Sequence, residues 1–228
     1  CLGDSNTHGY CADPADCADG GIRFNEDERW PCVLQKLLGD EYLVIEEGLS
    51  GRTTVFEDPL HESMDALSVA YPLLKSHEFI DLLIIMLGTN DSASKGPTGS
   101  PVSNADYKKN LLTIISRLRE MCPESIFVLH RPIWYSPNTY NGARYLVAGL
   151  NRATEYITPL EELARENDDI YLGDCKSYEL FKREHHRYMF AEKGNAGTFY
   201  LHPNESGAKR LAHFWAVAIA KIAKSAHQ

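Results

Sequence analysis

The sequence lacks the features that would mark several large classes of protein. No run of 18 apolar residues occurs, so we expect no membrane span. Lysine and arginine total 23 against 32 aspartates and glutamates, a formal charge of −9. This balance argues against a general nucleic-acid binder and against a surface attracted to anionic lipid. Neither glycine-rich phosphate-binding pattern, G-x-G-x-x-G or G-x-x-x-x-G-K-[ST], is present, so nothing supports nucleotide use.

Cysteine and histidine are too irregularly spaced to indicate a metal centre. The adjacent residues His185 and His186 have no acidic or cysteine partners at ligand spacing, and no C-x-x-C pair occurs. We therefore expect no metal and no cofactor. We expect the cysteines to be mostly free thiols, although Cys11 and Cys17 could pair in an oxidising compartment. The six cysteines are Cys1, Cys11, Cys17, Cys32, Cys122 and Cys175.

No repeat, low-complexity tract or linker divides the 228 residues, of which 43% are hydrophobic. We therefore expect one folded domain over residues 1–228. The chain begins with Cys1 rather than methionine, and Cys-Leu-Gly resembles the end of a strand whose start is missing. We expect a cytoplasmic protein; secretion stays an alternative because a signal peptide could have preceded Cys1.

Apolar runs alternate with helical periods along the chain. Strands are predicted at 43–45, 81–87, 125–129 and 169–172, and the run at 81–87 is continuous enough to be buried on both faces. Apolar residues recur at intervals of three and four near 30–38, 107–118 and 211–222, and Asn204 is a candidate N-cap for the last helix. This alternation predicts an α/β protein with a parallel sheet of about five strands, covered by helices on both faces.

Ligands of such sheets sit at the carboxyl ends of the strands, so we expect the functional residues at these positions. Polar, glycine-bearing segments stand there at 3–9 (Gly-Asp-Ser-Asn-Thr-His-Gly), 46–53 (Glu-Glu-Gly-Leu-Ser-Gly-Arg-Thr) and 88–91 (Gly-Thr-Asn-Asp). A fourth polar segment, Leu-His-Pro-Asn at 201–204, precedes the last helix.

These four segments resemble, in order, the four sequence blocks of the SGNH (GDSL-type) hydrolase superfamily. The matching residues are Ser5, Gly51, Asn90 and His202. The second block followed by Glu-Asp-Pro at 57–59, together with Arg-Trp at 29–30, is similar to the arylesterase/acyltransferase branch. The resemblance implies a three-layer α/β/α sandwich with a flavodoxin-like strand order. It also implies lipolytic-type esterase activity on short acyl groups such as acetyl, carried on carbohydrate or small alcohols, with acyl transfer as a second activity. Relatives in the branch form oligomers, so a homo-oligomer is expected here too.

Acyl transfer explains why these residue types are needed. A serine hydroxyl requires a histidine to accept its proton, and the developing oxyanion requires hydrogen-bond donors. By the resemblance, Ser5 is the nucleophile and His202 the base. The N–H groups of Ser5 and Gly51 and the amide of Asn90 form the oxyanion hole. Ser50 is a rival nucleophile, but its surroundings do not match the G-x-S-x-G elbow.

The family pattern breaks at the acid. An aspartate is expected three residues before the catalytic histidine, and Phe199 stands there. Three hypotheses compete: a backbone carbonyl orients His202, an acid from elsewhere does so, or the protein is a weakened relative. Asp174 and Glu205 are the nearest acids considered for the second hypothesis. The segment 176–198 is also unusual; it could line the pocket, reach a neighbouring subunit or be a solvated insertion.

Several further residues have both functional and structural interpretations. His8, Trp30 and Arg52 are candidate substrate contacts, although an exposed loop histidine, a core tryptophan and a block-anchoring ion pair are the simpler alternatives. Asp4 and Asp91 are expected to accept hydrogen bonds from loop backbone rather than to act as acids.

The sequence thus predicts a serine ester hydrolase for small-molecule esters. Phe199 motivates one alternative, a non-catalytic ligand-binding relative. A thioesterase or phosphodiesterase on the same scaffold is another.

Overall fold

The structure is a computed structural model that describes all residues except 14, 16, 18–20, 22, 56–78 and 227–228. The Glu-Asp-Pro segment at 57–59 therefore lies outside the described residues. The strands are β1 (Leu2–Gly3), β2 (Glu47–Gly48), β3 (Leu82–Met86), β4 (Ile126–Leu129), β5 (Ile170–Leu172), β6 (Glu192–Gly194) and β7 (Gly197–Phe199). The helices are α1 (Ser5–His8), α2 (Trp30–Leu38), α4 (Asn104–Met121), α5 (Leu146–Glu155), α6 (Ile157–Glu166), α7 (Lys176–Tyr188) and α8 (Glu205–Ala226).

The central sheet confirms the predicted fold class. Its five strands are parallel and lie in the order β2-β1-β3-β4-β5, which is the flavodoxin-like order. The chain leaves β1 toward α1 at the point where the strand order reverses. Ligands bind at this switch point in open α/β sheets, so the topology places residues 4–9 at the expected location of a site.

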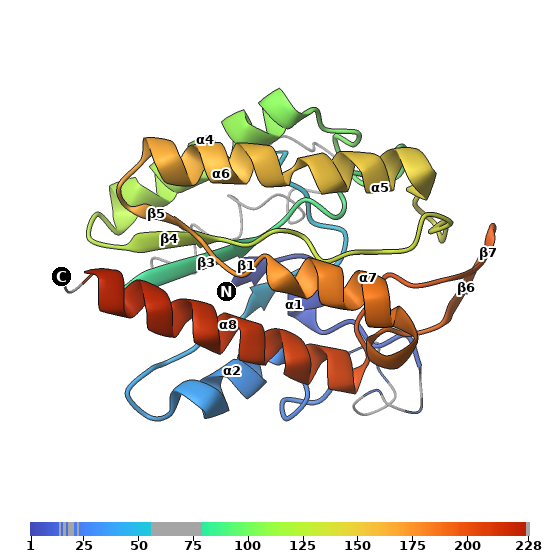
Figure 1. Ribbon diagram of the computed structural model, residues 1–228, viewed down its shortest axis with the longest axis horizontal. Helices are drawn as coiled ribbons and strands as arrows, with labels where there is room; N and C mark the ends of the chain where they lie inside the picture. Colours follow the sequence, from blue (N-terminus) through green and yellow to red (C-terminus); the bar gives the residue numbers. More distant parts are fainter. Residues whose placement is uncertain (14, 16, 18–20, 22, 56–78, 227–228) are drawn as a thin grey trace.

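Alternate residues of β3 point to opposite faces of the sheet, and each face has its own hydrophobic core. Leu83 and Ile85 pack with residues of α4 and α6. Ile84 and Met86 pack with residues of α2, α7 and α8. Figure 1 shows these two helical layers on either side of the strands. Burial of each such side chain stabilises the fold by about 1.5–3 kcal/mol, so both cores hold the sheet in place.

One predicted strand is misplaced. The expected strand at 43–45 is not regular, and β2 is instead Glu47–Gly48, because these are the residues of the segment that pair with β1 on its side away from β3. Leu43 is 80% exposed, so this run is not a core strand. The predicted helix cap is confirmed, since Asn204 Oδ1 accepts a hydrogen bond from the Gly207 N–H at 3.0 Å.

Segment 176–198 forms α7 and the antiparallel hairpin β6–β7, which the sequence did not predict as a sheet. The hairpin extends from one end of the molecule, beside the C-terminal end of α7 (Figure 1). His185 and His186 lie near the end of α7. The His186 ring is 2.8 Å from the Tyr200 hydroxyl, and the His185 ring packs on Trp134 with centroids 5.1 Å apart.

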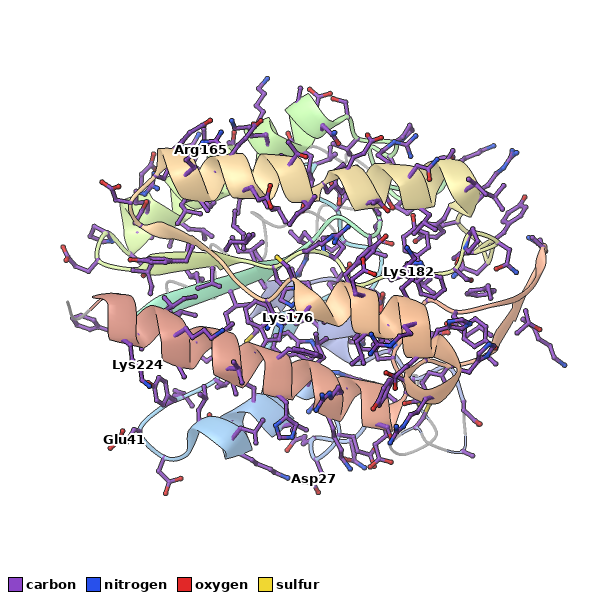
Figure 2. All side chains as sticks on the ribbon, viewed as in Figure 1. Asp27, Glu41, Arg165, Lys176, Lys182 and Lys224 are labelled. Atoms are coloured by element: carbon purple, nitrogen blue, oxygen red, sulfur yellow. The ribbon has the colours of Figure 1, made fainter. Side chains whose placement is uncertain are left out.

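Charged side chains occupy the outside of the helical layers. Figure 2 shows Arg165 on α6, Lys224 on α8 and Asp27 before α2 at the molecular surface. No helix in the described part of the chain has the length and apolarity needed to cross a membrane. The cysteines carry thiols. Cys11 and Cys17 each place Sγ 3.1 Å from the Asp13 carbonyl oxygen.

Candidate active site

Two residues from opposite ends of the chain meet at the carboxyl edge of the sheet. Ser5 follows β1 and begins α1, where Asp4 caps the helix by accepting from the Asn6 N–H at 2.9 Å. His202 lies just before α8, and its Nε2 is 3.0 Å from Ser5 Oγ although the two residues are 197 positions apart. Both are nearly buried, at 7% and 5% exposure. This distance suits proton transfer between a hydroxyl and an imidazole.

The other ring nitrogen of His202 faces a carboxylate. Its Nδ1 is 2.9 Å from Glu192 Oε1, and the same oxygen accepts the backbone N–H of His202 at 3.2 Å. A carboxylate is an acceptor only, so it favours the tautomer with hydrogen on Nδ1 and leaves Nε2 free to accept from Ser5. Ser5, His202 and Glu192 therefore form a continuous hydrogen-bonded chain.

Neither acid considered from the sequence contacts His202, and both interpretations are corrected. Asp174 accepts the Lys176 and Ser177 N–H groups at 3.0 and 2.8 Å, at the N-terminal end of α7. Its carboxylate lies 3.7 Å from a different histidine, His130. Glu205 lies in the first turn of α8 and pairs with Lys209, one turn farther along. The backbone-carbonyl hypothesis also fails, because the Glu192 carboxylate occupies that position beside the ring.

The hairpin explains how Glu192 replaces the acid missing at position 199. Glu192 on β6 is the direct cross-strand partner of Phe199 on β7. Directly opposed residues in an antiparallel pair place their side chains on the same face. Phe199 is 1% exposed and packs in a small core with Tyr145 and Leu201, while Glu192 reaches His202. Sequence reasoning missed Glu192, although the Gly-Asn-Ala-Gly turn at 194–197 signalled a hairpin.

A pocket of about 230 Å³ opens beside the Ser5–His202 pair. Gly51 and Asn90 line it, so the four residues matched by the resemblance meet there. Gly51 has φ = 85°, a left-handed conformation that favours glycine. The Asn90 side chain donates from Nδ2 to the Arg52 carbonyl at 3.0 Å and accepts at Oδ1 from the Tyr145 hydroxyl at 2.8 Å.

Other walls of the pocket come from residues that the sequence did not single out. Tyr10 packs against the His202 ring with centroids 4.3 Å apart. The loop between β4 and α5 contributes Asn141, Ala143 and Tyr145. No local pattern marks these residues, because the loop reaches the pocket only through long-range packing. Ser50, which the sequence did single out as a rival nucleophile, also lines the pocket, and its buried Oγ has no hydrogen-bond partner among the described residues.

The three residues predicted as candidate substrate contacts do not line this pocket in the described part of the chain. Each has a structural role instead. His8 directs Nδ1 to the Gly48 carbonyl at 3.2 Å. Trp30 is 1% exposed and stacks on Trp215 in the core. Arg52 is fully buried and donates to the Gly3 and Glu47 carbonyls and to the Glu47 carboxylate, which ties β1 to β2.

The two buried aspartates of the site hold loops, as expected. Asp91 accepts the Thr54 N–H at 2.9 Å and also bonds the Thr54 hydroxyl. Burial raises the pKa of Asp91 to about 6. Burial likewise raises the pKa of Asp4, whereas its bonds to Asn6 and the nearby His202 lower it. Both carboxyls shape backbone around the pocket and neither contacts the His202 ring in place of Glu192.

Comparisons with known proteins agree with this arrangement. The model of the GDSL-like lipase/acylhydrolase family matches residues 1–210. The aryl esterase of M. smegmatis is 25% identical with a TM-score of 0.73, and the alignment covers 97% of both chains. Est24, a carbohydrate acetylesterase from Sinorhizobium meliloti, is 22% identical with a TM-score of 0.73 over 97% of both chains. No curated protein gives a significant sequence match.

Proposed function

The chain belongs to the GDSL-like lipase/acylhydrolase family and is a carboxylic ester hydrolase, and from this premise we propose that it cleaves short-chain acyl esters through an acyl-enzyme on Ser5. The observation that carries the proposal is the hydrogen-bonded chain from Ser5 Oγ through His202 to the Glu192 carboxylate. A serine, a histidine and an acid in this order make up the machinery of acyl transfer on several unrelated folds.

In the first half-reaction, Ser5 Oγ attacks the ester carbonyl carbon while His202 Nε2 accepts the hydroxyl proton. Glu192 holds the imidazole in the required tautomer and stabilises the imidazolium by its negative charge. Collapse of the tetrahedral intermediate breaks the bond to the leaving oxygen. The imidazolium returns its proton to that oxygen, the alcohol departs and the acyl group remains on Ser5.

The developing oxyanion needs donors that are in place before the reaction starts. The N–H groups of Ser5 and Gly51 and the second amide hydrogen of Asn90 suit this role, because all three residues line one pocket. One such donor contributes about 10²–10³ to the rate. Ser5 begins α1, so its N–H belongs to the first turn and is not consumed by a helical hydrogen bond.

In the second half-reaction, water loses a proton to His202 Nε2 and attacks the acyl carbon. The resulting tetrahedral intermediate collapses by breaking the bond to Ser5 Oγ, which takes the proton from the imidazolium, and the carboxylic acid leaves. An alcohol in place of water yields a new ester, which is the acyltransfer activity expected from the resemblance. The pocket beside Ser5 has room for a small acceptor, so either water or a small alcohol can enter.

The size and walls of the pocket support a short acyl group. About 230 Å³ is below the 300–1,000 Å³ typical of sites for drug-sized ligands. Tyr10 and Leu201 narrow it from the side of His202, and Asn141 adds a polar group. An acetyl-type ester of an aryl or carbohydrate hydroxyl fits this mixture of aromatic and polar walls. The names of the aryl esterase and carbohydrate acetylesterase neighbours point to the same substrates.

A fluorophosphonate probe tests the nucleophile directly. We expect labelling of the native chain, retention of labelling in Ser50→Ala and loss of labelling in Ser5→Ala. Hydrolysis of p-nitrophenyl acetate should fall to background in Ser5→Ala. Labelling that moves with Ser50, or acetate turnover that persists in Ser5→Ala, would overturn the proposal.

The same assay separates the two alternative functions. A ligand-binding relative would show neither labelling nor turnover. A thioesterase or phosphodiesterase would turn over those esters in a Ser5-dependent manner and acetate poorly. The contact between Glu192 and His202 removes the main reason to favour a non-catalytic relative, since the substitution at Phe199 does not leave the histidine without an acid.

A further inference from the structure

The side chain of Asn90 is held in one orientation by a tyrosine from a distant loop. Asn90 Oδ1 accepts from the Tyr145 hydroxyl at 2.8 Å, across 55 positions of sequence, and Nδ2 donates to the Arg52 carbonyl at 3.0 Å. A carbonyl accepts and cannot donate, so the reverse amide orientation would place Oδ1 against the Arg52 oxygen. With both contacts made, one hydrogen of Nδ2 remains for a ligand oxygen.

We propose that Tyr145 is a positioning residue, which holds the Asn90 amide so that its free N–H points at the oxyanion. This inference rests on the proposed function, because an oxyanion forms only if Ser5 attacks an ester. Asn90 is 4% exposed and lines the pocket, so rotation of its amide would replace a donor by an acceptor beside the reacting oxygen. Electrostatic stabilisation depends on donors that are fixed before charge develops.

The loop around Tyr145 is built to hold this phenol. The N–H groups of Tyr145 and Leu146 both donate to the Thr139 carbonyl, each at 3.2 Å. Leu146 has φ = 53°, a left-handed conformation that is costly for a residue with a side chain. Backbone strain of this kind persists where surrounding contacts over-determine it, and it is concentrated at functional sites.

A glycine inside a helix supports the same conclusion. Gly149 lies in α5, where glycine costs about 1 kcal/mol relative to alanine. A Cβ at Gly149 would lie 3.2 Å from Cβ of Tyr145 and 3.0 Å from the Tyr135 hydroxyl. The absence of a side chain therefore lets α5 pack closely behind Tyr145. Burial also raises the pKa of the Tyr145 phenol, which favours the protonated hydroxyl as a hydrogen-bond donor to Asn90.

Tyr145→Phe tests the proposal because it removes only the hydroxyl. With p-nitrophenyl acetate we expect kcat to fall about tenfold with KM changed less than twofold, as for an interaction made in the transition state. Tyr156→Phe is the matched control, since its buried hydroxyl donates to the Val102 carbonyl at 2.7 Å, away from the pocket. Tyr156→Phe should lose about as much thermal stability as Tyr145→Phe, while its kcat stays within twofold of the native value.

A double-mutant cycle isolates the coupling. Asn90→Ala alone should lower kcat about 10²–10³-fold, and adding Tyr145→Phe should then lower it by less than twofold. A tenfold loss of kcat on adding Tyr145→Phe to Asn90→Ala would overturn the proposal. A Tyr145→Phe variant whose KM rises at unchanged kcat would also overturn it. Acetate turnover that survives in Ser5→Ala would instead overturn the proposed function itself. A Ser5-dependent enzyme with unchanged kcat in Tyr145→Phe would overturn only the role of Tyr145.

Discussion

Glu192 and Phe199 face each other across the β6–β7 hairpin, and this pairing explains how the site has an acid without one in the expected position. Both side chains lie on the same face of the ribbon. The buried ring of Phe199 anchors the hairpin in the core with Tyr145 and Leu201, and the carboxylate of Glu192 contacts His202. The position three residues before His202, on β7, carries Phe199 and no acid. The hairpin supplies the acid from the opposite strand, where Glu192 on β6 contacts His202.

Glu192→Gln tests the acid by removing the charge at nearly constant size. An amide at this position can donate to Nδ1 and so stabilises the wrong histidine tautomer. We therefore expect kcat to fall by up to about 10⁴-fold. Steady-state hydrolysis of an aryl acetate measures the change. Glu205→Gln is the control, since Glu205 pairs with Lys209 at the surface and should leave kcat nearly unchanged. A larger effect at Glu205 than at Glu192 would contradict the assignment.

Gly194→Ala tests whether hairpin placement matters to activity. A Cβ at Gly194 would lie 2.3 Å from the Tyr140 carbonyl oxygen and 2.8 Å from the Phe199 ring. The hairpin must shift to relieve these contacts, and a shift of about 1 Å at a catalytic group can cost about 100-fold in rate. We expect kcat to fall at least tenfold in the same assay. Gly142→Ala is the control, because nothing lies within 4 Å of its added Cβ. Equal activities in the two variants would show that the hairpin tolerates displacement.

Arg52→Met tests the clamp between β1 and β2. Arg52 is 0% exposed and donates to the Gly3 and Glu47 carbonyls, so methionine leaves these acceptors and the Glu47 carboxylate without their cation. We expect the free energy of unfolding in urea to fall by about 3–5 kcal/mol. Arg183→Met is the control; Arg183 pairs with Glu184 at the surface, and such a pair is worth at most about 1 kcal/mol. Similar losses in both variants would argue against a clamp.

His130 should make stability depend on pH. Burial lowers its pKa to about 4, against the raising effect of nearby Asp174. The unfolded chain, with a histidine pKa near 6.5, binds more protons between these values. The contribution of His130 to the free energy of unfolding is therefore complete above about pH 6.5 and is lost as pH falls toward 4. In urea titrations, His130→Gln should reduce the slope of unfolding free energy against pH by roughly 1 kcal/mol per unit in this window.

Asp91 contributes a pH dependence of stability with the opposite sign, and this contribution must be separated from that of His130. Its raised pKa of about 6 means that its contribution is lost as pH rises through that value. Asp91 is present in both proteins, so the difference between the native chain and His130→Gln isolates the histidine. An unchanged slope in His130→Gln would contradict the role of His130.

The α/β class, the parallel sheet and the four polar segments that meet in one pocket could be predicted from the sequence. These follow from local signals: apolar periodicity marks strands and helices, and the carboxyl ends of parallel strands necessarily share one edge. Ser5, Gly51 and Asn90 are adjacent to strand ends, so their convergence required only the topology. Even here β2 was misplaced, because strand length depends on the pairing partner as well as on the apolar run.

The acid that reaches His202 and the residue that holds Asn90 could not be predicted from the sequence, because both depend on contacts between distant segments. Glu192 acts through hairpin register and through docking on the loop at 138–145, where the Asn195 N–H donates to the Tyr140 carbonyl at 2.8 Å. Tyr145 reaches Asn90 across 55 positions. Asp174 and Glu205 were the acids considered from the sequence, but Asp174 accepts the first N–H groups of α7 and Glu205 pairs with Lys209 on α8. Side-chain contacts between distant loops depend on packing, which leaves no period in the sequence from which to predict them.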